Sequence, residues 1–186
     1  MKHSMEFELA WQGLKPGVHV YEYEVGMDFM TLHGEARHEY KDIQAQVKLR
    51  FDKHEGFFQL HFDIGGHIIT PCDRCGDDFR MELWDEFDLV VKLTGGDEEH
   101  EEEEDADVVF IPRSETVIDV SKWIYEFIIL SIPIQRIHPN DSQGKPGCNE
   151  AALKLLGLMS EHKDEQKNDI WKGLESIRIT DNNKRK

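Results

Sequence analysis

Residues 42–64, DIQAQVKLRFDKHEGFFQLHFDI, decide the fold, because apolar and polar residues alternate in two stretches of this segment. The apolar positions are Ile43, Ala45, Val47, Leu49 and Phe51 in the first stretch and Phe58, Leu60, Phe62 and Ile64 in the second. Such alternation is typical of β-strands with one buried face. The segment DKHEG (52–56) predicts a hairpin loop between the two strands, in which Gly56 supplies a positive φ.

The alternation continues on both sides of this hairpin. Residues 79–93 form a third, longer stretch, in which Asp85 alone breaks the apolar parity. Residues 20–25 predict a weaker strand before the hairpin, and DVVFIP (107–112) and TVID (116–119) predict two short strands after it.

The period changes from two to that of a helix after residue 119. The apolar face consists of Val120, Trp123, Ile124, Phe127, Ile128 and Ser131. Asp119 is a suitable N-cap, and Pro133 ends the helix. NEAALKLLGLM (149–159) predicts a second helix capped by Asn149. A polar linker, SEHKDEQKND (160–169), leads to a last turn around Ile170, Trp171 and Leu174.

The order of strands first and helices second predicts an α+β fold. We expect an antiparallel β-sheet or partly closed barrel of long strands, followed by a buried helix and short C-terminal helices. The length of 186 residues predicts a single domain, 1–186.

Composition narrows the class of protein. The amino end has no apolar core of a signal peptide, and WIYEFIIL (123–130) is too short to span a membrane. Three cysteines are too few, and an odd number, for a disulfide framework. The sequence therefore predicts a cytoplasmic protein with reduced thiols.

The net charge of −16 is concentrated in residues 97–107, DEEHEEEEDAD, which hold nine acids and no Lys or Arg. We expect a solvated, disordered acidic loop at 96–106 and a flexible tail from about residue 176. An alternative is that Glu101, Glu102, Glu103 and Glu104 attract a basic protein partner. The charge disfavours naked nucleic acid as the main ligand, because phosphate contacts need clustered Lys and Arg.

The segment ITPCDRCGDDF (69–79) carries the candidate chemistry, in Cys72 and Cys75. A redox pair of this spacing normally lies at a helix N-terminus, whereas this pair lies in a turn between predicted strands. Asp73, Asp77 and Asp78 are expected to raise the thiol pKa and so to disfavour a reactive thiolate. Two thiolates three residues apart, with Gly76 to tighten the turn, are instead a suitable clip for zinc.

A closed zinc site needs two more ligands, and His138 and Cys148 lie in a loop after the main helix. Cys72, Cys75, His138 and Cys148 therefore predict a Cys₃His zinc site that ties the sheet to the helices. Against it, the separation of ten between His138 and Cys148 exceeds the usual spacing. The alternatives are structural thiols with a surface histidine, or ligands from His61 and His67, which also suit a polar strand face.

The sequence contains none of the common catalytic motifs: no His-Glu-x-x-His, no phosphate-binding glycine loop and no Gly-x-Ser-x-Gly.

The chain resembles the YceD family, the large ribosomal RNA subunit accumulation proteins, from about Val20 to Leu174. The matching parts are PCDRC (71–75), DVSKWIYEFIILSIPIQRIHP (119–139) and NDIWKGLESI (168–177), in that order. Its long loops look like those of a Bacteroidetes-type variant.

The resemblance implies a non-enzymatic role in 23S ribosomal RNA accumulation and large-subunit biogenesis. The partner would be a basic ribosomal protein or precursor RNA, with Arg74 and Arg136 as candidate contacts. Two alternatives stay open: a thiol-disulfide oxidoreductase using Cys72 and Cys75, and a zinc-stapled interaction domain without a ribosomal role.

Overall fold

The computed structural model describes residues 6–34, 40–95 and 107–165. The predictions for the acidic loop at 96–106, for the last turn around residues 170–174 and for the tail from 176 lie outside this part of the chain.

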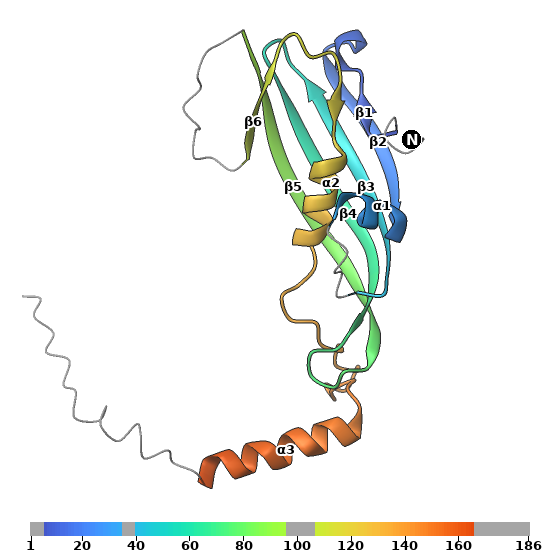
Figure 1. The fold of residues 1–186 in the computed structure, drawn as a ribbon, viewed down its shortest axis with the longest axis vertical. Coiled ribbons are helices and arrows are strands. Elements are labelled where there is room, and N and C mark those ends of the chain that lie inside the picture. Colours follow the sequence, from blue (N-terminus) through green and yellow to red (C-terminus); the bar gives the residue numbers. More distant parts are fainter. Residues whose placement is uncertain (1–5, 35–39, 96–106, 166–186) are drawn as a thin grey trace, which may run out of the picture.

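A five-stranded sheet in the order β2-β3-β4-β5-β6 forms the body of the protein (Figure 1). The strands are β2 (Gly17–Gly26), β3 (Asp42–Lys53), β4 (Phe57–Pro71), β5 (Asp78–Thr94) and β6 (Val108–Pro112). The first four pair antiparallel, as predicted. In the described residues β2 and β6 are the two edges and do not pair, so the sheet is open rather than a barrel.

One strand departs from the antiparallel order, because β6 runs parallel to the last residues of β5. Parallel neighbours need a connection of about a dozen residues or more. The chain between Thr94 and Val108 provides this length, while the hairpins between β3, β4 and β5 are too short for anything but antiparallel pairing.

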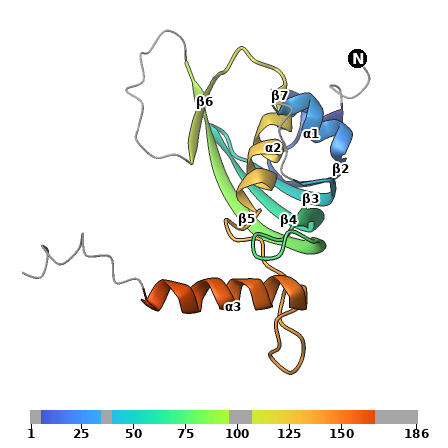
Figure 2. The same cartoon turned by 60° about the horizontal axis from the view of Figure 1, so that its bottom comes forward.

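Two helices and the two short strands lie on one face of this sheet, while α3 lies beyond its end (Figures 1 and 2). β1 (Glu8–Leu9) pairs with β7 (Ile118–Asp119), and α1 (Met27–His33) and α2 (Ser121–Leu130) lie side by side. α1 has only seven residues, too few for a clear helical period, and the sequence reasoning missed it. We call the face under these elements the inner face and the opposite one the outer face.

The core lies between the inner face and α2. The predicted apolar positions of β3 and β4 are buried, as are Ile124 and Ile128 of α2. Phe127 of α2 stacks on Phe87 at 4.5 Å between ring centroids and meets the edge of Phe62 at 5.0 Å. These contacts confirm the predicted buried helix.

The ends of the two predicted helices follow their caps. α2 begins at Ser121 with Val120 as its N-cap, one residue after the predicted cap Asp119, whose carboxylate still accepts the Ser121 N–H at 2.9 Å. The Asn149 side chain likewise accepts the Ala151 N–H at 2.9 Å, at the start of α3 (Glu150–Glu165). The linker expected from residue 160 is wrong as far as 165, because this polar stretch has no Gly or Pro to end the helix.

The predicted positive φ of Gly56 is also wrong. The loop closes by a bond from the His54 N–H to the Phe57 carbonyl, and the Gly56 carbonyl is fixed by the Leu93 N–H of β5. No helix in the described part of the chain is long and apolar enough to cross a membrane.

Candidate metal centre

The turn between β4 and β5 presents the two cysteines at one end of the sheet. The Gly76 N–H donates to the Cys72 carbonyl and the Cys72 N–H to the Asp77 carbonyl, each at 2.9 Å. Gly76 has a φ of 79°, in the left-handed region that favours glycine. Gly76 thus tightens the turn, as the sequence predicted.

A small hairpin in the loop after α2 brings His138 and Cys148 together, although ten positions separate them. Asn140 and Pro146 form an isolated antiparallel bridge, and the Gly147 N–H donates to the Pro139 carbonyl. A Cβ on Gly147 would lie 2.7 Å from that carbonyl oxygen, so only glycine fits this close approach. The residues between the two candidate ligands are therefore folded out of the way.

Asp73 fastens this loop to the cysteine turn. Its N–H donates to the Arg136 carbonyl at 2.8 Å, and its carboxylate accepts the Arg136 N–H at 2.7 Å and the guanidinium at 3.2 Å. The Arg136 backbone bond, aided by the guanidinium, lowers the pKa of Asp73. Asn149 adds a bond to Asp77 at 3.2 Å. The predicted partner contact Arg136 thus has a structural role in this turn.

The turn and the loop together gather the four predicted ligands. Their ligand atoms, three Sγ and one imidazole nitrogen, all lie within 4.8 Å of one another. Cys72 Sγ lies 3.8 Å from Cys148 Sγ, and Cys75 Sγ lies 3.5 Å from His138 Nδ1. Phe79 supports the imidazole, with ring centroids 4.5 Å apart.

These distances fit a tetrahedral metal ion. Zn–S bonds of about 2.3 Å and Zn–N bonds of about 2.0 Å separate neighbouring ligand atoms by roughly 3.5–3.8 Å. Three thiolates and one imidazole are also a donor set that zinc prefers. An S–S bond, by contrast, needs about 2.05 Å between the sulfurs, and all three cysteines are free thiols.

The protonation of Cys72 differs from the sequence-based expectation. Burial raises the pKa of its thiol, but backbone N–H groups of His138, Arg74 and Cys75 and the His138 ring lower it to about 6. Burial and the neighbouring Cys72 raise the pKa of Cys148. The expectation that nearby carboxylates keep Cys72 protonated is wrong, because the amides point at the sulfur while Asp73 is bonded to Arg136.

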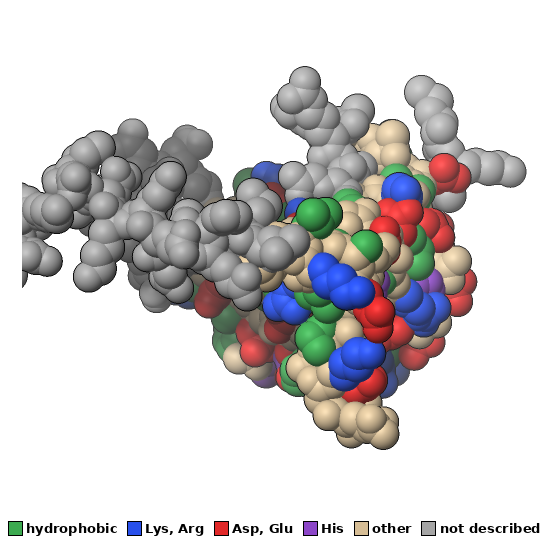
Figure 3. All heavy atoms as spheres, turned by 90° about the horizontal axis from the view of Figure 1, so that it is seen from below, with side chains coloured by type: hydrophobic (Ala, Val, Ile, Leu, Met, Phe, Trp, Pro, Cys, Tyr) green, Lys and Arg blue, Asp and Glu red, His purple; other side chains and the backbone are tan. Residues whose placement is uncertain are grey.

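The remaining predicted contacts lie elsewhere or outside the described residues. Arg74 is exposed on the turn, at an end of the molecule where basic and acidic side chains are interspersed (Figure 3). Glu101, Glu102, Glu103 and Glu104 are not described. His61 and His67 are not part of the cysteine cluster, and His61 instead lies with Asp63 and Glu86.

Sequence reasoning missed the residues that hold the ligands in place. Asp141 accepts the N–H groups of Gln143 and Lys145, and Gly144 has a φ of 79°. An Asp three residues before a Gly is a turn signal that could have predicted this hairpin. The contacts of Asp73 with Arg136 join residues 63 positions apart, and no local pattern indicates them.

Comparison with known protein families matches residues 60–178 to the family described as "Large ribosomal RNA subunit accumulation protein YceD". The chain belongs to the YceD family. The YceD match covers most of β4, all of β5, α2 and α3, and all four candidate ligands, and so includes the whole candidate centre. No curated protein and no solved structure gave a match.

Proposed function

We propose that this YceD-family chain is a non-enzymatic, cytoplasmic assembly factor for the large ribosomal subunit that binds a basic ribosomal protein. The family is named for accumulation of the large-subunit ribosomal RNA, which supports the ribosomal role. The net charge of −16 supports a basic protein rather than bare RNA as the direct partner, because carboxylates repel phosphates.

The geometry of the cysteine cluster carries the second part of the proposal, a structural zinc held by Cys72, Cys75, His138 and Cys148. Four ligand atoms that all lie within 4.8 Å of one another, two pairs of them at 3.8 Å and 3.5 Å, come from two segments that are distant in sequence. Zinc would neutralise the clustered thiolates and fix the loop after α2 to the turn after β4. The residues themselves position the loop, through the contacts of Asp73 with Arg136.

A closed set of four protein ligands is typical of structural zinc, whereas catalytic zinc keeps one position open. This favours the non-enzymatic role over thiol-disulfide exchange. Cys72 and Cys148 are only 3% and 6% exposed, so an exchanging disulfide would reach them with difficulty. A zinc-stapled domain without a ribosomal role stays the other alternative.

Elemental analysis tests the metal. Protein purified without added metal should hold one zinc per chain, and Cys75→Ser should lower both the zinc content and the melting temperature. Chelator should do the same to the parent protein, because zinc affinity is realised partly as folding free energy. We expect the parent protein to show no disulfide reductase activity. A measurable activity that Cys75→Ser abolishes would favour the redox alternative.

The ribosomal role is tested in cells. A deletion strain should hold less mature 23S RNA relative to 16S RNA, and a normal ratio in cold and warm growth would remove this role. A pull-down at low and high salt, with protein and RNA both identified, then distinguishes the partners. A ribosomal protein captured without RNA supports the proposal, while RNA captured without protein contradicts it.

A further inference from the structure

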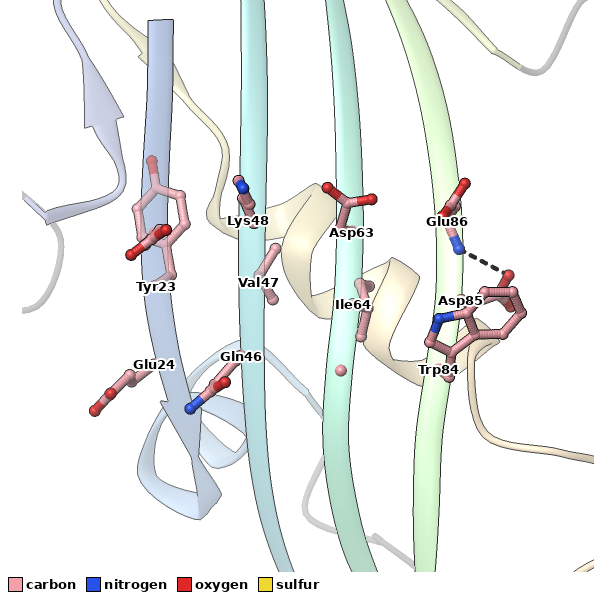
Figure 4. A pocket seen from close by; sticks show the side chains of 12 residues that line it. Tyr23, Glu24, Gln46, Val47, Lys48, Asp63, Ile64, Trp84, Asp85 and Glu86 are labelled. Carbon is pink, nitrogen blue, oxygen red and sulfur yellow. Dashed lines mark hydrogen bonds between the residues drawn. The ribbon is translucent and has the colours of Figure 1, made fainter.

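The outer face of the sheet carries a hollow of about 450 Å³ that crosses β2, β3, β4 and β5 (Figure 4). It lies on the opposite side of the strands from α2. Its β4 residues lie within the strand, whereas the cysteine turn follows the end of β4. Gly65 lies on its floor, and a Cβ built there meets no other atom within 4 Å. The missing side chain therefore leaves the middle of the outer face open.

Trp84 borders the hollow from β5, directly opposite Gly65 in the strand register. Trp84 is 78% exposed, the highest fraction among the large hydrophobic aromatic residues of the described part of the chain. A tryptophan normally gains stability by burial, and this one contributes little to the core. A bare indole beside an open floor is instead a surface on which a planar group can stack.

The rest of the lining is strongly acidic. The hollow is lined by five carboxylate residues and by Lys48 as the one basic residue, all of them described. Glu22 and Glu24 on β2 have no side-chain hydrogen bond or ion pair in the described part of the chain. Asp63 on β4 and Glu86 on β5 line the other side of the hollow, and a carboxylate oxygen of each lies within 4.0 Å of the His61 ring. Lys48 lies opposite Glu22 in the strand register, so one lysine faces this group of carboxylates.

We propose that this hollow binds an arginine side chain of a basic protein segment. The flat face of a guanidinium can stack on the indole while its N–H groups donate to carboxylate oxygens in the plane of the guanidinium. A lysine ammonium is not planar and cannot make both contacts at once. Charge complementarity selects this occupant, because the same carboxylates would repel the phosphates of a nucleic acid. The inference rests on the proposed function, since it names the surface that the basic partner would contact.

Titration of the full chain, as purified, tests the site. The probe is an end-capped Gly-Arg-Gly-Arg-Gly peptide, observed by NMR at the Trp84 indole N–H, which Trp84→Phe identifies. We expect this resonance to shift on binding, and the affinity to fall as salt rises. The same peptide with neutral citrulline in place of arginine should not bind.

Three variants separate the hollow from general charge attraction. Trp84→Ala should weaken binding about fivefold or more through loss of the cation–π contact. Gly65→Leu should block binding by filling the floor without changing any charge. Glu126→Gln, on α2 at the inner face, removes one carboxylate and should leave the affinity unchanged. Unchanged affinity in Trp84→Ala and Gly65→Leu, or equal binding of the citrulline peptide, would overturn the proposal.

The outcomes also distinguish this inference from the ribosomal role. A uridine oligonucleotide that shifts the Trp84 resonance as strongly as the arginine peptide would overturn the choice of a protein ligand. If the deletion strain loses 23S RNA but the peptide does not bind, the proposed function stands and the hollow is not an arginine site. Peptide binding with a normal 23S level would remove the ribosomal role and keep the hollow as an arginine site.

Discussion

The two faces of the sheet are made by the same strands but differ in what their side chains do. On β4, Phe62 points to the inner face and is fully buried against Phe127 of α2. Phe57 belongs to the outer-face parity of the same strand and is 37% exposed. Leu83 and Trp84 repeat the contrast on β5, where the first is 3% and the second 78% exposed.

This difference separates stability from recognition. The inner face holds the fold by removing apolar area from water. The outer face has few such contacts, so its side chains can be selected for a ligand at little cost in stability. Residues of one strand that point to opposite faces should therefore respond very differently to the same substitution, and three matched pairs test this. A further comparison follows the charged side chains of the outer face as pH changes.

The largest effect is expected for Phe62→Ala. It removes a fully buried ring and leaves a cavity between β4 and α2, which should lower the free energy of unfolding by about 3–5 kcal/mol. Phe57→Ala, on the outer face, should lower it by less than about 1 kcal/mol, because the ring mainly stacks on His54. Urea unfolding measures both, and losses of equal size would break the contrast between the faces.

Neighbouring glycines of β4 give the second comparison. Gly66, on the inner-face parity, has a φ of 135°, and a Cβ there would lie 2.2 Å from the Gln44 carbonyl oxygen. Gly66→Ala should therefore cost about 2–4 kcal/mol through strain and displacement of β3. Gly65→Ala meets no atom within 4 Å and should change stability by less than about 1 kcal/mol. A tolerated Gly66→Ala in thermal unfolding would show that β3 can move aside.

The sequence predicted the two faces because the pattern is local. Alternation along residues 42–64 places each side chain on a face, and the same parity places Leu83 inside and Trp84 outside. The missed features have no such period. α1 is too short to show one, and the parallel pairing of β6 depends on where a long connection returns.

The sequence was enough to predict the ligands of the candidate metal centre, but not the hydrogen bonds that hold those ligands in place. Cysteine and histidine are rare enough to be grouped by type, and all four predicted ligands lie together. The contacts of Asp73 with Arg136 and the amides that lower the pKa of Cys72 depend on tertiary structure. Parity places Trp84 on the outer face, but its exposure of 78% also depends on α1 and α2 lying on the other face, which no local pattern indicates.

The third comparison concerns pH, and it tests the charged network of the outer face around His61. Partial burial lowers the pKa of His61, but hydrogen bonds to Asp88 at 2.7 Å and Asp63 at 3.1 Å outweigh it. Arg50 opposes these carboxylates, and Glu86 lies 4.0 Å away. The pKa of His61 is thus raised above 6.5.

A raised pKa in the folded state sets the sign of the effect. The stabilisation is complete below the unfolded value of 6.5 and is lost as pH rises through the folded value. The difference in free energy of unfolding between the parent and His61→Gln should therefore shrink from about pH 6 to about pH 8. Its size should stay near 1 kcal/mol or less, as for other surface ion pairs. If the difference between the parent and His61→Gln instead grows from pH 6 to pH 8, the carboxylates are not the dominant influence on the pKa of His61.

The smallest effect on stability is expected for Trp84→Ala, although it removes the largest side chain of all. With 78% of the indole already in water, folding buries little of its area, and the free energy of unfolding should change by no more than about 0.5 kcal/mol. Leu83→Ala, one residue earlier and 3% exposed, should cost about 2–4 kcal/mol although it removes fewer atoms. Urea unfolding of both variants checks the prediction. A large loss in Trp84→Ala would mean that the indole packs on the strands, and the outer face would then stabilise the fold as the inner face does. A neutral Trp84→Ala that no longer binds the arginine peptide would place recognition and stability on opposite sides of one strand.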